Sequence, residues 1–470
     1  MTQKNKTIKS YIMRKKTAIL LIVLALACQD AFSQNIIWDE TPEQRKERMQ
    51  WWTNDRFGMF IHWGIYALPA RHEWVKQRER LTNEDYQKYF DNFNPDLYDP
   101  AEWAKMAKDA GMKYVVLTAK HHDGFCLFES EYTDYHAGNT PYGKDLIKEY
   151  VDAFRAEGMG VGFYYSLIDW HHPHFTIDRV HPQRTASAEE YERMNRGRDM
   201  AVYREYMKNQ VRELLTNYGK IDIIWLDFSY PGEFGKGHQE WGSVELLKMV
   251  RELQPHILVN NRLDLMEYRD GWDFVTPEQF KVQSWPEIDG EKIPWETCQT
   301  FSGSWGYYRD EHTWKDNKQL LVLLIESVSK GGNVLLNVGP TARGTIDYRA
   351  QSALEKMGEW MKYNNRSIYG CTQAPREFEV PGHTLLTYNP ETNRLYVHLI
   401  DYPMTNFLLP GMQGRVRYAQ FLHDASEILM TEPYGHQRVG DIATEADLNL
   451  RLPVNKPNVE IPVIELFLYD

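Results

Sequence analysis

Acidic and histidine side chains occur where apolar, strand-like segments of this 470-residue chain end. The clearest case is Asp227, near the C-terminal end of the β-branched run Ile221–Phe228. Burying a carboxylate is unfavourable unless other groups offset it, so a buried strand that carries one is expected to use it. Such a carboxylate can act as a nucleophile, or it can bind a metal ion together with histidines. The segment therefore predicts part of an active-site floor.

Three roles for Asp227 stay open on the residues alone. In the first, His62, His121 and His122 bind a metal ion with Asp227 as a further ligand, although the His-x-His pattern usual on the first strand of metal-dependent barrels is absent. In the second, Asp227 is the nucleophile of a glycoside hydrolase and a later glutamate is the acid/base. In the third, Asp227 is only a structural ion-pair partner, for example of Arg262.

The elements that must position these residues alternate between strand-like and helical segments, which is typical of a parallel α/β sheet. Helices are expected at Pro100–Ala110, Asp145–Ala156, Arg198–Tyr218, Glu245–Gln254 and Leu320–Lys330. The candidate strands are Phe57–Trp63, Tyr114–Ala119, Gly160–Ser166, Ile221–Phe228, Ile257–Asn260, Trp272–Thr276, Thr297–Phe301 and Asn333–Val338. Eight such strands predict a (β/α)8-like, TIM-type barrel over residues 34–365.

The pattern changes after about Tyr363 to short alternating runs separated by Pro, Gly and Asn. These runs are Phe378–Val380, Thr384–Tyr388, Arg394–Leu399, Val416–Leu422 and Val463–Leu468. They predict a C-terminal antiparallel β-sandwich over residues 366–470.

In a barrel of this type the C-terminal ends of the strands and the loops after them meet at one site. The polar and aromatic residues at these predicted ends are His62, Trp63, His72, Glu73, Trp74, His121, His122, Asp123, Tyr164, Tyr165, Asp169, Trp170, His171, Trp225, Asp227, Asn261, Arg262, Glu278, Glu296 and Trp305. We therefore expect many of these side chains to share a single pocket.

The N-terminus has the pattern of an export signal rather than of folded structure. A basic segment at residues 4–16 precedes the apolar segment Ala18–Ala27, and Ala31-Phe32-Ser33 fits a cleavage site. We expect cleavage after Ser33 and a periplasmic or secreted protein, with lipoprotein processing at Cys28 as the alternative. The apolar segment is short for a membrane span. The formal net charge of −12 argues against nucleic-acid binding.

Six motifs follow one another along the predicted barrel. They are WTNDRFGMFIHWG at 52–64, YVVLTAKHHDGF at 114–125, GFYYSLIDW at 162–170, IWLD at 224–227, WETCQTFSGSWGY at 295–307 and GGNVLLNVGP at 331–340. Together they resemble the α-L-fucosidases of glycoside hydrolase family 29. The resemblance implies an exo-acting, retaining double displacement that releases α-linked L-fucose from fucosylated glycans without a metal or organic cofactor.

The resemblance also implies roles for single residues. Asp227 matches the family nucleophile, and Tyr164 matches a sugar contact for which the adjacent Tyr165 is the alternative. The residues that match sugar contacts are His62, Glu73, Trp74, His121, His122, Tyr164, Trp225, Arg262 and Trp305.

The acid/base is expected at Glu278, in the run Asp273–Glu278, with Glu296 second and Glu287 third. In a retaining enzyme it lies about 5–5.5 Å from the nucleophile. A fucose-binding protein without turnover, on a degenerate barrel, is the alternative from another functional class. Such a protein would lack a carboxylate on the leaving-group side of Asp227.

Overall fold

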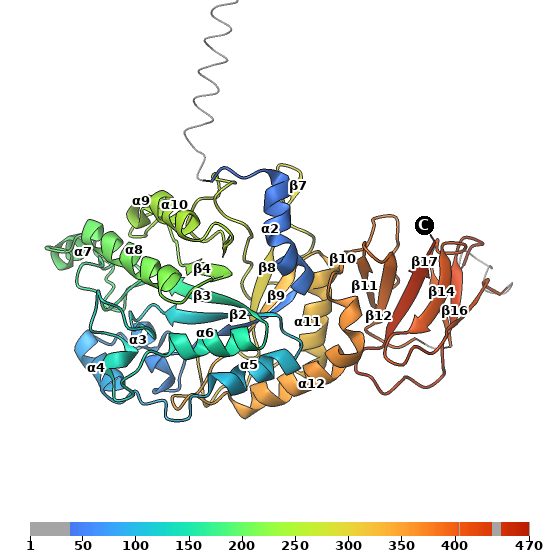
Figure 1. Cartoon of the computed structure of the whole chain (residues 1–470), viewed down its shortest axis with the longest axis horizontal. Coiled ribbons are helices and arrows are strands. Elements are labelled where there is room, and N and C mark those ends of the chain that lie inside the picture. The colour runs from blue at the N-terminus through green and yellow to red at the C-terminus, as the bar shows by residue number, and fades with distance from the viewer. Residues whose placement is uncertain (1–37, 404, 435–442, 470) are drawn as a thin grey trace, which may run out of the picture.

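A computed structural model describes residues 38–403, 405–434 and 443–469, and it contains a parallel barrel followed by an antiparallel β-sandwich (Figure 1). The barrel sheet has the strand order β5-β4-β3-β2-β1-β9-β8, and each neighbouring pair is parallel. Its strands are β1 Phe57–Ile61, β2 Tyr114–Lys120, β3 Gly160–Ser166, β4 Ile223–Asp227, β5 Leu258–Val259, β8 Glu296–Thr300 and β9 Asn333–Val338. Every described residue of these strands is buried except Gly160, as expected for a parallel sheet covered on both faces.

The sixth predicted strand, Trp272–Thr276, is wrong as a regular strand. This segment joins its neighbours through isolated parallel bridges, which pair Asn260 with Phe274 and Val275 with Trp295. Pro277 has no N–H to extend the pairing, but a last bridge between Glu278 and Cys298 follows it. An irregular segment therefore fills the gap between β5 and β8, and it carries Glu278.

Helices cover the outside of the barrel. The five helices expected from the sequence are present, with no end shifted by more than three residues. The α-helices of the described chain are α2 Pro42–Asp55, α3 Val75–Arg78, α4 Asn83–Asp91, α5 Pro100–Asp109, α6 Ile147–Ala156, α7 Ala188–Met194, α8 Met200–Thr216, α9 His238–Trp241, α10 Ser243–Leu253, α11 Asn317–Ser329 and α12 Tyr348–Asn364. A short hairpin, β6 Glu287–Ile288 and β7 Glu291–Lys292, occupies the place where a helix would follow the sixth segment.

The C-terminal domain contains two antiparallel sheets that enclose a separate apolar core. The first has the order β10-β11-β12-β17-β14, with β10 Thr372–Gln373, β11 Thr384–Asn389, β12 Arg394–Leu399, β14 Val416–Phe421 and β17 Val463–Leu468. The second has the order β13-β16-β15, with β13 Asn406–Leu409, β15 Leu429–Thr431 and β16 Leu448–Arg451. The predicted run Phe378–Val380 is not a strand, because Phe378 closes a turn by donating its N–H to Pro375.

The helices α11 and α12 connect the barrel to the sandwich. The indole of Trp360 on α12 donates to the carbonyl of Ile461, and α11 contacts β10 and β11. Helix α12 ends at Asn364 and β10 begins at Thr372. The predicted domain boundary, between residues 365 and 366, lies in the segment that joins them and stays a prediction. The predicted signal peptide lies outside the described residues. Within the described ranges, no helix has both the length and the apolar character needed to cross a membrane.

Arg56 ties the start of β1 to the end of the barrel. Its buried guanidinium donates to the carbonyls of Cys371 and Gly331, both at 2.8 Å, and to Asn333 Oδ1 at 3.3 Å. We expect Arg56→Met to lower the free energy of unfolding by roughly 3–5 kcal/mol, because it leaves several buried acceptors without a donor. Urea unfolding measures this, with the exposed Arg196→Met as the matched control. An unchanged midpoint for Arg56→Met would contradict the assignment.

Candidate active site

One cavity of about 310 Å³ opens at the C-terminal ends of the barrel strands. Its walls come from the ends of β1, β2, β3, β4 and β8 and from the loops that follow them. The structure brings to this cavity all eleven residues to which the resemblance gives a role: His62, Glu73, Trp74, His121, His122, Tyr164, Trp225, Asp227, Arg262, Glu278 and Trp305.

Asp227 ends β4 with its carboxylate held between two donors. Arg262 Nη1 donates to Oδ1 and the hydroxyl of Tyr164 donates to Oδ2, each at 2.8 Å. Burial raises the pKa of Asp227, and the charge of Arg262 opposes that shift. The next residue, Phe228, has φ +89°, a strained backbone conformation of the kind that clusters at functional sites. The carboxylate is therefore fixed in direction and kept beside a counter-charge.

A second carboxylate lies close to Asp227. Arg262 Nη1 is also 2.8 Å from Glu278 Oε2, so the two carboxyl oxygens that it contacts are at most twice that distance apart. The rest of the guanidinium is held by Thr276, through its Oγ1 and its carbonyl, and lies over the ring of Trp225. The arrangement orients one guanidinium toward both carboxylates at once.

The three candidate acids have different surroundings. Glu278 lies in the cavity wall with its side chain 42% exposed, where a leaving group can reach it. Glu296 is fully buried below the cavity, where the hydroxyl of Tyr114 and the indole of Trp52 donate to its Oε2. Glu287 lies on β6, outside the cavity, with Arg376 as an ion-pair partner at 3.6 Å. Only Glu278 of these three lines the same cavity as Asp227.

Glu296 makes the stability of the fold depend on pH. Burial raises its pKa to about 7 from an ordinary value of 4.5, so the folded chain keeps this proton at a pH where the unfolded chain releases it. The stability from this group is complete below about pH 4.5 and falls as the pH rises toward about 7. The free energy of unfolding of the wild type is expected to fall by on the order of 3 kcal/mol between pH 5 and pH 8 because of this group. Glutamine cannot ionise, so this fall is expected to be absent in Glu296→Gln.

Urea unfolding of the wild type and of Glu296→Gln at both pH values tests this expectation. The exposed Glu287→Gln is the control and is expected to show the wild-type pH dependence. The same pH dependence in Glu296→Gln and the wild type would contradict the buried placement of Glu296.

The histidines of the cavity are neutral hydrogen-bonding groups. Burial lowers the pKa of His62 to about 3 and those of His121 and His122 well below 6.5. His62 Nδ1 lies 2.6 Å from Asn337 Oδ1, which places its proton on Nδ1 and leaves Nε2 as an acceptor. His122 Nδ1 lies 2.7 Å from the hydroxyl of Ser166, which itself donates to a carbonyl, so His122 Nε2 is also an acceptor.

Neutral imidazoles with a free acceptor nitrogen suit the hydroxyl groups of a sugar. A metal site would need these histidines and Asp227 to converge on one point. Within residues 38–403, 405–434 and 443–469, no three side chains of His, Cys, Asp or Glu are grouped to hold a metal ion.

Glu73 joins two sides of the cavity. Its Oε2 accepts hydrogen bonds from the backbone N–H groups of Trp305 and Gly306, at 3.1 and 2.9 Å. Burial raises its pKa to about 7, and the hydrogen bond from the Gly306 N–H opposes that shift. The loop after β1 is therefore fixed to the loop after β8, which positions the indole of Trp305 beside His62, with ring centroids 5.0 Å apart.

The two adjacent tyrosines of β3 point in opposite directions, as alternation along a strand requires. Tyr164 enters the cavity and bonds Asp227, whereas the hydroxyl of Tyr165 donates to Gln210 on α8 outside the barrel. Asp169, another predicted strand-end residue, accepts from the backbone N–H groups of His171 and His172 and pairs with Lys120. It caps a loop and does not line this cavity.

Sequence reasoning named His72 but left out several other residues that line the cavity: Phe60, Arg78, Phe228, Gln279, Cys298 and Gly303. Phe60 was within reach, because it lies two residues before His62 and shares its face of β1. Cys298 shares the inward face of β8 with Glu296 for the same reason. Arg78 ends the single-turn helix α3, and the others lie on loops, where periodicity carries no information on direction.

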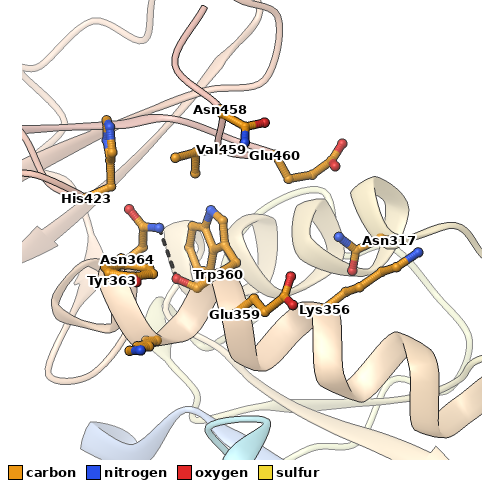
Figure 2. Close-up of a pocket in the computed structure, with 11 residues that line it drawn as sticks. Asn317, Lys356, Glu359, Trp360, Tyr363, Asn364, His423, Asn458, Val459 and Glu460 are labelled. Carbon is orange, nitrogen blue, oxygen red and sulfur yellow. Dashed lines mark hydrogen bonds between the residues drawn. The ribbon is translucent and has the colours of Figure 1, made fainter.

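A larger cavity, of about 760 Å³, lies between α12 and the C-terminal domain. Figure 2 shows Trp360 and Asn364 of α12 on one side and His423 and Val459 on the other. It contains none of the residues predicted for the site. Among the described residues, its lining includes two carboxylates, those of Glu359 and Glu460, but no arginine that could orient them as Arg262 orients Asp227 and Glu278.

Comparisons with known proteins agree with this geometry. A family model described as α-L-fucosidase matches residues 23–366. The chain is 27% identical to the α-L-fucosidase of Dictyostelium discoideum, over 84% of this chain and 87% of that protein, and 28% identical to the human tissue α-L-fucosidase, over 76% and 77%. It is similar to the structure of α-L-fucosidase isoenzyme 1 from Paenibacillus thiaminolyticus, with 46% identity, TM-score 0.84, and coverage of 91% of this chain and 100% of that chain. The chain belongs to the α-L-fucosidase family of glycoside hydrolases.

Proposed function

We propose that the chain releases terminal α-L-fucosyl residues from glycans by a retaining double displacement, with Asp227 as nucleophile and Glu278 as acid/base. The observation that carries the proposal is Arg262 Nη1, which lies 2.8 Å from one oxygen of each carboxylate. The separation of these two oxygens is therefore compatible with the 5–5.5 Å between the two carboxyl groups that is typical of retaining enzymes. It is well below the largest carboxyl separations of inverting enzymes. Inverting enzymes need a wider gap because a water molecule must fit between the carboxyl groups.

In the first step, the Asp227 carboxylate attacks the anomeric carbon while Glu278 donates its proton to the oxygen of the leaving group. The bond to the leaving group breaks, and a covalent fucosyl ester forms on Asp227. In the second step, Glu278 removes a proton from water, which attacks the same carbon and frees Asp227. Burial of Asp227 and exposure of Glu278 fit these roles, because the leaving group must depart on the open side.

The walls of the cavity suit a single deoxy sugar. His62, His121 and His122 offer neutral imidazole nitrogens to hydroxyl groups, and Glu73 adds a carboxylate. Phe60, Trp74, Trp225, Phe228 and Trp305 add aromatic surface for the C6 methyl group and the apolar face of the ring. A cavity of about 310 Å³ with buried floor residues holds one terminal sugar, which supports exo-acting hydrolysis.

Two observations from relatives support the proposal. A similar structure from Bacteroides thetaiotaomicron, 27% identical with TM-score 0.76, is described as a trapped covalent intermediate of an α-L-fucosidase formed with 2-fluoro-fucosyl fluoride. A Thermotoga maritima α-fucosidase, 26% identical with TM-score 0.72, is described in complex with a mechanism-based inhibitor. Export of the chain, with removal of residues 1–33, is a further part of the proposal and rests on the sequence pattern.

The stereochemistry of the product tests the proposed function. Hydrolysis of 4-nitrophenyl α-L-fucoside, followed by proton NMR, is expected to give α-L-fucose as the first product, before mutarotation. First release of the β-anomer would contradict the double displacement. Binding of fucose without turnover of this substrate or of a fucosylated oligosaccharide would instead support a non-catalytic binding protein.

A further inference from the structure

A groove of about 580 Å³ lies on the outside of the barrel, between β8 and α11, both labelled in Figure 1. We call it the outer groove; it is lined by Gln279, Lys281, Gln299 on β8 and side chains of the segment Lys315–Leu323. A regular barrel has a helix at this place, but here the short hairpin β6–β7 follows the sixth segment instead. The outer groove is therefore a consequence of the irregular sixth segment, which also carries Glu278.

Gln279 joins the outer groove to the active-site cavity, because its side chain lines both. Its N–H donates to the carbonyl of Cys298 at 3.0 Å, and its Nε2 donates to Thr300 Oγ1 at 2.6 Å. On β8, Cys298 faces the active-site cavity and the next residue, Gln299, faces the outer groove, as alternation along a strand requires. Strand β8 is therefore the wall between the two cavities, and Gln279 crosses its C-terminal end.

The outer groove lies on the side of the active site from which the leaving group departs. In the proposed reaction Glu278 gives its proton to the oxygen of the leaving group, and its side chain is 42% exposed. Gln279 follows Glu278 directly and has φ +51°, in the left-handed region, which turns the chain at this point. A glycan attached to the fucosyl residue therefore has a continuous path from Glu278, over Gln279, into the outer groove.

The polar groups of the outer groove suit hydroxyl groups. Gln279 uses its Nε2 for Thr300, so its Oε1 is left to accept a hydrogen bond. Gln319, near the start of α11, accepts from the N–H of Asp316 with its Oε1 at 2.8 Å, so its Nε2 is left to donate. Val322 lies on the same face of α11, three residues after Gln319, and is half-buried. An acceptor, a donor and an apolar surface together match the hydroxyl groups and the C–H face of a sugar.

The lysines of the outer groove already have partners. Lys281 forms an ion pair with Glu326 at 2.6 Å, and Lys318 forms one with Asp401 of the C-terminal domain at 3.2 Å. Lys315 donates to a backbone carbonyl at 2.6 Å. An anionic ligand would have to compete with these partners, whereas a neutral sugar can use the amides and leave them in place.

We propose that the outer groove binds neutral sugars of the leaving glycan, beyond the sugar to which the fucosyl residue is attached. Gln279 connects the groove to the acid/base, the amides of Gln279 and Gln319 match hydroxyl groups, and the partnered lysines favour a neutral ligand. Fucosylated oligosaccharides are then better substrates than a fucosylated disaccharide, because only the longer glycans reach the groove. The inference rests on the proposed function, in which Glu278 faces the leaving group.

Substrates of different length test the inference. The full chain is assayed on a neutral fucosylated disaccharide and on two neutral tetrasaccharides, which extend the second sugar of this disaccharide at different hydroxyl groups. We expect kcat/KM of the wild type to be about tenfold higher for at least one tetrasaccharide, mainly through a lower KM, which is the size of one or two net hydrogen bonds. Equal kcat/KM for all three substrates would overturn the inference.

A bulky side chain at Gln319 is expected to close the outer groove. Gln319→Trp is expected to bring the ratio of kcat/KM for the tetrasaccharide to that for the disaccharide close to one. The aryl fucoside has no second sugar, so its hydrolysis is expected to match the wild type. Gln44→Trp is the matched control, because both glutamines are exposed and each is the third residue of a helix and part of a capping box. Gln44 lies on α2 and does not line the groove, so this control is expected to keep the wild-type ratio. An unchanged ratio in Gln319→Trp would contradict the inference.

Val322→Ala is a second variant, which removes apolar surface from the groove without adding bulk. It is expected to lower the ratio for the tetrasaccharide and the disaccharide about threefold. A wild-type ratio in Val322→Ala would contradict the inference even if circular dichroism showed Gln319→Trp to be misfolded. The charge of the ligand is tested with the same tetrasaccharide carrying a sulfate ester on its third sugar. It is expected to be no better a substrate than the neutral form, and a kcat/KM about tenfold higher would overturn the assignment to neutral sugars.

Failure of the proposed function is distinguishable from failure of this inference. If the wild type does not turn over the aryl fucoside, the proposed function fails, and calorimetric titration with the disaccharide and the tetrasaccharides still tests the groove. Tighter binding of a tetrasaccharide, which Gln319→Trp abolishes and Gln44→Trp keeps, would support the groove alone. Equal affinities for the disaccharide and both tetrasaccharides would overturn it.

Discussion

Asp227→Gly is expected to lower kcat/KM for 4-nitrophenyl α-L-fucoside by about 10⁴-fold or more, the effect of removing a catalytic nucleophile. The carboxylate is buried at the end of β4 and is held by Arg262 and Tyr164, so no neighbouring group can replace its attack on the anomeric carbon. The small side chain leaves room for an external anion. Sodium azide is therefore expected to restore turnover and to give β-fucosyl azide, because one displacement inverts the anomeric centre.

The exposed Asp152→Gly, on α6, is the matched control for loss of a carboxylate and is expected to keep wild-type activity. Circular dichroism of both variants checks that they are folded. Residual activity of Asp227→Gly within tenfold of the wild type, or azide rescue with α-fucosyl azide as the product, would be incompatible with Asp227 as nucleophile.

Glu278→Ala is expected to have a second large effect, and its size depends on the leaving group. A fucosylated oligosaccharide needs protonation of its leaving oxygen, so kcat/KM is expected to fall by about 10²–10⁴-fold. The 4-nitrophenolate leaving group needs no proton, so the first step on the aryl fucoside is much less affected and the fucosyl-enzyme accumulates. Azide attacks this intermediate without a general base, and the expected product is α-fucosyl azide.

Two carboxylates serve as controls for Glu278. Glu287→Ala removes an exposed carboxylate outside the cavity and is expected to act like the wild type. Glu296→Gln removes a carboxyl group from below the cavity and is expected to keep the leaving-group dependence of the wild type. If Glu296→Gln lost activity selectively on the oligosaccharide while Glu278→Ala retained it, the acid/base assignment would be wrong.

Much of the fold was predictable because parallel barrel strands are continuous apolar runs. The segments around Phe57, Tyr114, Gly160, Ile223 and Asn333 are such runs, and each is a strand. The segment Trp272–Thr276 was misassigned because only Phe274 and Val275 form bridges, one to each neighbouring segment. Its residue types alone do not show how many of its residues find partners. Strands of three or four residues in the sandwich, such as β15, are too short to show alternation.

The site was predictable to the extent that barrel topology places strand ends together. That rule selected Asp227, His62 and Tyr164 as residues of one cavity. It could not rank Glu296 below Glu278, because the depth of a side chain along β8 depends on register and not on residue type.

The most direct test of the account is the site of covalent attachment of the sugar. The chain is incubated with 2-deoxy-2-fluoro-α-L-fucosyl fluoride, digested, and analysed by tandem mass spectrometry. Fluorine at C2 slows both steps, and the fluoride leaving group keeps the first step fast enough for the ester to accumulate. The account predicts one added fluorofucosyl group on the peptide that contains Asp227, and no label in Asp227→Gly. A label on another carboxylate, or rapid turnover of the reagent without any label, would contradict a double displacement through Asp227.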